Sequence, residues 1–173
     1  MALDWAKAFD RISPTGLIDA LRRFGLPHVF LDIIQNIYKD REFFVRDMGH
    51  QSTNHFQCHG ISQGCPLSPF LFVIVMTIVM HDATTKLQQM YGDILITPLL
   101  VHDLLYADDT LLFDVHASNV QKYMDVIISV GGEYGLQINW GKWKYLVFDV
   151  IRIFSQQMVY KSSKNNQLHI LEH

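Results

Sequence analysis

The sequence has little cysteine and no excess of positive charge. Two cysteines among 173 residues cannot build a disulfide framework. Seventeen acidic side chains outnumber fourteen basic ones, so the chain lacks the lysine and arginine surplus with which proteins that coat nucleic acid neutralise phosphates. Charged residues make up only 18% of the chain and apolar residues 49%, which excludes intrinsic disorder and provides material for a sizeable core. We therefore expect one globular, intracellular domain.

The sequence also lacks a hydrophobic run of membrane-spanning length. Its longest apolar stretch, residues 67–80, contains Ser68 and Pro69. A spanning helix needs about 20 apolar residues. We therefore expect no membrane segment but a buried core helix, which begins at Pro66 or Pro69 and continues to about Met90.

Hydrophobic spacing and turn residues predict strands interleaved with helices. Helices are expected where apolar residues recur at intervals of three and four, over residues 13–25, 29–38 and 118–134. Strands are expected where short apolar runs are bounded by turns, at residues 1–5, 43–45, 56–58, 94–96, 104–106, 111–113 and 145–148. Hairpins mixed with helices favour an α+β fold with a mostly antiparallel sheet packed on helices.

Acidic residues gather in one part of the chain, because residues 101–150 hold seven acidic against three basic side chains. There, Asp108 and Asp109 lie between two strand-like runs, where each alone is typical of a turn. Two adjacent carboxylates repel each other, which favours a cation site. Asp4 lies in an apolar, strand-like context, where a carboxylate is costly unless it is paired or bound to metal. If these segments are neighbours, three carboxylates converge in a manner that suits Mg²⁺.

Four short motifs follow one another along the chain: LDWAKAFD at 3–10, GISQGCPLSP at 60–69, LYADD at 105–109 and GLQINWGK at 135–142. Together they resemble palm motifs A, B, C and D of the reverse transcriptases, specifically those of LINE-type (non-LTR) retrotransposons. Group II intron maturases are the nearest alternative, but Cys65-Pro66-Leu67 favours the LINE type. The resemblance implies a polymerase palm with a small part of the fingers over residues 1–148. Residues 149–173 form an unassigned C-terminal tail.

The resemblance implies a catalytic role for four residues. Asp4, Asp108 and Asp109 would be the ligands of two Mg²⁺ ions, or of Mn²⁺, in nucleotidyl transfer. Lys142 would donate a proton or place a positive charge near the leaving pyrophosphate, and Lys144 is also within reach of that place. By spacing alone, this lysine is equally consistent with a solvated strand edge.

The resemblance also implies a substrate-binding role for four residues. Ala8 would offer a backbone amide to the triphosphate, and Phe9 would select deoxynucleotides because its ring clashes with a 2′-hydroxyl. Gln63 and Gly64 would lie against the incoming nucleotide and the template base. Without the motif, Phe9 would be taken for a core aromatic and the Gln63-Gly64 pair for a helix-opening loop. Asp10 matches no ligand position and is expected to be structural.

The implied activity is RNA-directed DNA synthesis, with an RNA template, a DNA primer and deoxynucleoside triphosphates as partners, at an intracellular, nuclear location. The chain departs from the family in three places. Ser62 stands where many LINE-type enzymes have arginine, and neither the fingers motifs that precede motif A nor a thumb is visible. We therefore expect a fragment that requires the missing fingers and thumb. The alternative is an inactive or domesticated palm that acts as a binding module: the intact aspartates favour the enzyme, and the truncation favours the module.

Overall fold

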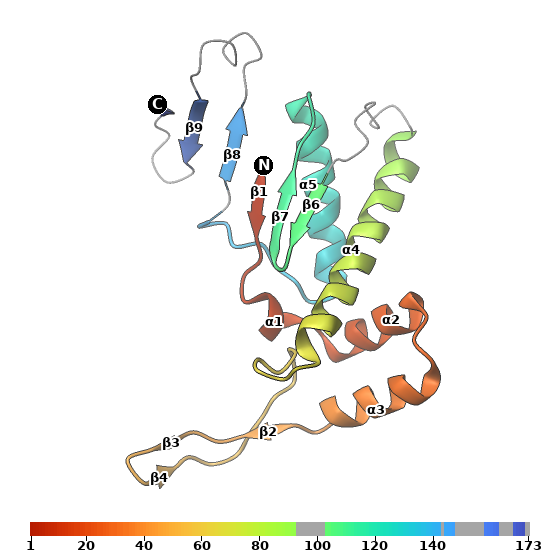
Figure 1. Ribbon diagram of the computed structural model, residues 1–173, viewed down its shortest axis with the longest axis vertical. Helices are drawn as coiled ribbons and strands as arrows, with labels where there is room; N and C mark the ends of the chain where they lie inside the picture. Colours follow the sequence, from red (N-terminus) through yellow and green to blue (C-terminus); the bar gives the residue numbers. More distant parts are fainter. Residues whose placement is uncertain (93–102, 143, 148–157, 163–167, 172–173) are drawn as a thin grey trace.

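A computed structural model describes residues 1–92, 103–142, 144–147, 158–162 and 168–171 of the chain (Figure 1). The helices are α1 (Ala8–Arg11), α2 (Pro14–Phe24), α3 (His28–Tyr38), α4 (Ser68–Tyr91) and α5 (Ala117–Glu133). The strands are β1 (Ala2–Asp4), β2 (Glu42–Phe43), β3 (Arg46–Asp47), β4 (His50–Gln51), β5 (His55–Phe56), β6 (Asp103–Tyr106), β7 (Asp109–Leu112), β8 (Lys144–Val147), β9 (Met158–Ser162) and β10 (Leu168–Leu171).

The described strands form a six-stranded sheet in the order β10-β9-β8-β1-β7-β6. Every neighbouring pair in this sheet is antiparallel, which confirms the predicted α+β fold. β1 lies between β7 and β8, so the first residues of the chain form an inner strand (Figure 1). β9 and β10 fall in the stretch that the sequence left unassigned. The strand predicted at 94–96 and the end of the run at 148 lie outside the described residues.

The core lies between one face of the sheet and the long helices. Side chains of β1 and β7 join those of α2, α4 and α5 in one buried cluster, which includes Leu3, Leu112, Phe72 and Ile127. α4 packs against both α2 and α5, and it begins as predicted, with Pro69 in its first turn. By its length and composition alone, α4 is also long and apolar enough to cross a membrane. The core helices of globular domains meet the same two criteria, and 44% of the most apolar window of α4 is buried in the structure.

Two segments differ from the expectation. The strands predicted at 43–45 and 56–58 are replaced by a split hairpin, in which β2 pairs with β5 and β3 pairs with β4. Each of these strands is only two residues long. All residues of these four strands are exposed, so no buried face fixes a longer register. The second difference is α1, a single helical turn that the sequence did not reveal. The chain enters it through Lys7, whose φ of 50° turns the backbone sharply away from β1.

Three polar side chains tie α2 to α4 and to the end of α5. Arg23 pairs with Asp82 through both terminal guanidinium nitrogens, and Tyr134 donates its hydroxyl proton to Oδ2 of Asp82 at 3.0 Å. The hydrogen bond from Arg23 holds the pKa of the Asp82 carboxyl below its ordinary value. Burial, followed by the hydrogen bond to Asp82, raises the pKa of Tyr134 to about 12.

We expect Asp82→Asn to lower the free energy of unfolding by about 1–2 kcal/mol near pH 7, since the pair is partly exposed. The folded-state pKa of Asp82 is depressed, so its contribution is complete above the unfolded pKa of about 3.9 and is lost as pH falls through the folded value. Urea unfolding between pH 2 and 7 measures this. The difference in the free energy of unfolding between wild type and variant should disappear at low pH. A difference that stays constant across this pH range would contradict the prediction. Asp125→Asn, which removes an exposed carboxylate bonded to Gln121 on α5, is the control with little effect.

Candidate active site

Asp4 and Asp109 face each other across two paired strands. β1 runs antiparallel to β7 and places Asp4 directly opposite Asp109 in register. Side chains at such opposing positions share one face of a sheet, with Cβ atoms about 4.5–5.5 Å apart. The next pair, Leu3 and Thr110, points to the other face and is buried, and Trp5 Nε1 donates to Thr110 Oγ1 at 3.2 Å. Asp4 and Asp109 therefore lie on the face that the helix-packed core does not cover.

Asp108 lies in the two-residue turn that joins β6 to β7. Tyr106 pairs with Asp109, so only Ala107 and Asp108 form the turn. Ala107 has a φ of 55°, a left-handed conformation that costs a non-glycine residue on the order of 1 kcal/mol. Within the described residues, neither the Asp108 nor the Asp109 carboxylate has a hydrogen-bond or ion-pair partner. The end of the hairpin therefore presents two adjacent carboxylates, Asp108 in the turn and Asp109 at the start of β7, with no partner among the described side chains.

Asn139 and Lys142 hold Asp4 from the side of motif D. Asn139 Nδ2 donates to Asp4 Oδ2 at 2.8 Å, and the Asn139 backbone N–H donates to the Asp4 carbonyl oxygen, also at 2.8 Å. Lys142 Nζ lies 3.7 Å from the same Oδ2 atom. Lys144, the other lysine considered, lies in β8 and pairs with Ala2. The role of Asn139 was missed because its contact with Asp4 spans 135 residues, and only its place in the motif hinted at it.

The donor set fits a divalent cation in part. Mg²⁺ prefers oxygen ligands and is commonly held by one or two protein carboxylates, with water and phosphate completing its shell. Asp4 and Asp109 offer two such groups from paired strands. Among the described residues, however, no three His, Cys, Asp or Glu side chains gather closely enough to hold a metal ion. The structure therefore pairs Asp4 with Asp109 but does not bring Asp108 into one three-residue cluster with them.

The substrate-binding candidates lie along α1 and the loop before α4, residues 60–67, here called the motif B loop. Ala8 is buried, and the half-buried ring of Phe9 stacks on Phe72 with 4.4 Å between ring centroids. Gln63 is exposed and donates from Nε2 to Asp10 Oδ1 at 2.9 Å. Gly64, also exposed, has a φ of 86°. Asp10, the neighbour of Phe9 in α1, thus ties Gln63 to α1 through this hydrogen bond, so its role is structural, as expected.

Close backbone approach explains two glycines of the motifs. Gly60 has a φ of 88°, and a Cβ there would come within 2.7 Å of the Asp10 Cα atom. Gly135 has a φ of 89°, and a Cβ there would overlap the carbonyl oxygen of Arg11. Both contacts fall on the last two residues of α1. Motifs B and D therefore dock on the same short helix, α1, at the end of motif A.

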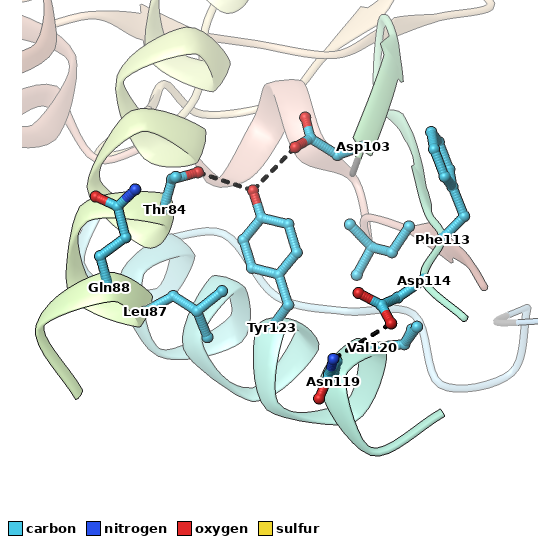
Figure 2. Close-up of a pocket in the computed structure, with 10 residues that line it drawn as sticks. Thr84, Leu87, Gln88, Asp103, Phe113, Asp114, Asn119, Val120 and Tyr123 are labelled. Carbon is cyan, nitrogen blue, oxygen red and sulfur yellow. Dashed lines mark hydrogen bonds between the residues drawn. The ribbon is translucent and has the colours of Figure 1, made fainter. Parts of the chain in front are cut away.

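A small cavity of about 70 Å³ lies elsewhere, between α4, α5 and the β6–β7 hairpin (Figure 2). Its lining includes Leu112, which points to the face of β7 opposite to Asp109. The Tyr123 hydroxyl points to Asp103 and Thr84, with oxygen–oxygen distances of 3.0 and 2.9 Å. Burial raises the pKa of Tyr123 above its ordinary value, so the phenol stays neutral. This cavity is separate from the carboxylate face.

Comparisons with known proteins agree on one family. The family model for reverse transcriptase (RNA-dependent DNA polymerase) matches residues 1–171. The Pol polyprotein of the type-2 retrotransposable element R2DM from Drosophila melanogaster is 30% identical over 137 residues, covering 79% of this chain and 12% of that protein. The RNA-directed DNA polymerase from the mobile element jockey, also of Drosophila melanogaster, is 27% identical over 144 residues, covering 79% and 15%.

A likeness to a solved structure extends over nearly the whole chain. Telomerase from Candida albicans, solved with a fragment of telomeric RNA, matches with a TM-score of 0.57 and 16% sequence identity. The match covers 99% of this chain and 30% of that one, and at this identity it shows a shared fold alone. The chain spans only 12% of the length of the R2DM polyprotein and 15% of the length of the jockey polymerase.

Proposed function

The chain belongs to the reverse transcriptase (RNA-dependent DNA polymerase) family, and we propose that it carries the palm site for RNA-templated transfer of deoxynucleotides to a primer. Its similarity to the R2 and jockey proteins confirms the LINE-type resemblance. The observation that carries the proposal is the register of β1 and β7, which sets Asp4 opposite Asp109 on the face that the helix-packed core leaves open.

Reverse transcriptases use divalent metal ions, which when bound lower the cost of activating the primer hydroxyl and of releasing pyrophosphate. In this chain Asp4 and Asp109 would hold such an ion, with Asp108 beside them in the turn. Asn139 orients the Asp4 carboxylate through its side-chain amide. Lys142, whose ammonium is 3.7 Å from Asp4, would give a proton to the departing pyrophosphate.

The remaining candidates would select and position the nucleotide. Ala8 would present its backbone amide to the triphosphate, and the Phe9 ring, backed by Phe72, would exclude a 2′-hydroxyl by steric clash. Gln63 and Gly64 on the exposed rim of the motif B loop would lie against the nucleotide and the template base. An RNA template and a DNA primer would lie across the open face of the sheet.

We expect the 173-residue chain alone to extend a primer very weakly. In-line transfer requires the hydroxyl, the metal ions and the phosphate to be held in precise alignment. A displacement of about 1 Å from that alignment can lower the rate on the order of a hundredfold. The chain spans only 12% of the R2DM polyprotein, so the grip on the duplex would come from further polypeptide. The measurement is extension on an RNA template with Mg²⁺ or Mn²⁺. Robust extension that Asp108→Asn abolishes would show the chain to be self-sufficient.

The test of the function uses a chimera, in which residues 1–147 replace the matching segment of the R2DM polyprotein. We expect this R2 chimera to extend a primer on RNA, and its Asp108→Asn form to fail. A folded chimera as inactive as that variant would contradict the proposal. If such a chimera still bound template–primer duplex as tightly as the R2DM protein itself, the alternative function of a non-catalytic binding module would be favoured.

A further inference from the structure

Arg41 joins the base of the β2–β5 hairpin to the motif B loop. It lies between α3 and β2, and its guanidinium donates to Ser62 Oγ and to the Gly60 carbonyl oxygen, both at 2.6 Å. The guanidinium carbon lies 4.2 Å from the centroid of the Tyr38 ring. Among the described residues, Nε of Arg41 has no acceptor, so these three contacts are what hold a half-buried cation.

The opposite side of the motif B loop is held by the segment that carries Phe9. The Ile61 backbone N–H donates to the Phe9 carbonyl oxygen at 2.7 Å, and the Gly60 N–H donates to the Ile12 carbonyl oxygen at 2.8 Å. Ile61 itself is 1% exposed. The loop is therefore fixed between Arg41 on one side and the Phe9–Ile12 turn on the other, so a shift of the loop would displace Phe9 and Gln63 together.

We propose that Arg41 is a positioning residue for the incoming nucleotide: it fixes the motif B loop against the backbone of Phe9. The inference rests on the proposed function, because it takes Phe9 and Gln63 to be the groups that meet the nucleotide. Both terminal nitrogens of Arg41 donate hydrogen bonds at the same time, while the guanidinium carbon lies over the Tyr38 ring. A lysine ammonium lacks that planar fork, so Arg41→Lys is expected to behave like Arg41→Met.

The first test follows hydrogen exchange of single backbone amides in the 173-residue chain. In Arg41→Met we expect the Ile61 and Gly60 amides to exchange about tenfold faster or more, with the buried amides of α4 unchanged. Equal rates in variant and wild type would overturn the proposal. A uniform acceleration that includes α4 would also overturn it, because Arg41 would then contribute only global stability. Arg46→Met, which removes an exposed hairpin contact with Gln51, is the matched control and should leave Ile61 unchanged.

The second test measures nucleotide use by the R2 chimera. We expect Arg41→Met to raise the KM for deoxynucleotides about tenfold while kcat stays within about threefold, because a loose loop weakens nucleotide binding. The double variant Arg41→Ser with Ser62→Arg returns a guanidinium to the same junction and should recover most of the lost KM. An unchanged KM in Arg41→Met, or a double variant no better than it, would overturn the proposal. If the wild-type chimera fails to extend, the proposed function fails, and the exchange rates still decide the role of Arg41.

Discussion

Replacing Asp4 with asparagine is expected to lower primer extension by the R2 chimera about a thousandfold or more, equivalent to about 4 kcal/mol of transition-state stabilisation. Asparagine keeps the size of the side chain and an oxygen that can accept from Asn139 Nδ2. It removes the negative charge that faces Asp109 and that would hold a divalent cation. The loss should therefore come from cation binding and not from misfolding, because the hydrogen bonds that fix β1 remain available.

Electron paramagnetic resonance can measure the affinity of the 173-residue chain for Mn²⁺. This assay reports the effect of Asp4→Asn on cation binding without any turnover. We expect Asp4→Asn to weaken Mn²⁺ binding about tenfold or more, since one of a few charged ligands is lost. Asp125→Asn is the matched control, because Asp125 is an exposed acid on α5 whose carboxylate bonds only to Gln121 among the described residues. Extension by Asp4→Asn within threefold of wild type would end the catalytic interpretation of this residue.

Replacing Phe9 with valine is expected to let ribonucleotides compete with deoxynucleotides, raising their relative use by the R2 chimera about 10- to 100-fold. The ring is held on one side by Phe72 and is half-buried, so its free edge can act as a wall toward a sugar. Valine removes that wall but leaves the backbone contact with Ile61 in place. Use of deoxynucleotides should therefore change much less than use of ribonucleotides.

Single-nucleotide extension with matched ribo- and deoxynucleotide substrates gives the ratio directly. Phe70→Val serves as the control, because Phe70 is 69% exposed on α4 and its loss should leave the ratio unchanged. An unchanged preference in Phe9→Val would show that Phe9 serves only to pack against Phe72.

Local signals predicted the four longer helices, α2 to α5, well. Ser13 accepts a hydrogen bond from the Gly16 N–H at 3.0 Å, and Gly25 ends α2 with a φ of 100°, so the ends of this helix follow from cap chemistry. Exposed segments were predicted less well, as the split hairpin before the motif B loop shows. The site residues came from the family resemblance, and their spacing along the chain could not give the register that sets Asp4 opposite Asp109.

Contacts between distant residues account for what the sequence did not reveal. Asn139 meets Asp4 across 135 positions, and Arg41 meets Ser62 across 21 positions. Neither pair follows from helix or strand periodicity, because both depend on how separate elements pack. The absence of an arginine at position 62 was visible in the sequence, but only the fold shows that the Arg41 guanidinium reaches Ser62.

The inner position of β1 affects the order in which the protein can fold during its synthesis. This strand is made before its partners, which are the residues of β7 and Lys144 of β8, and before Asn139, which binds the Asp4 carboxylate. At about 5–20 residues per second, a ribosome needs on the order of ten seconds to reach these partners. Until then, Leu3 and Trp5 have no sheet to join, and long-range pairing of this kind is slow. The carboxylate pair therefore cannot assemble before β7 has been made, and a nascent chain that ends before β7 cannot contain the site.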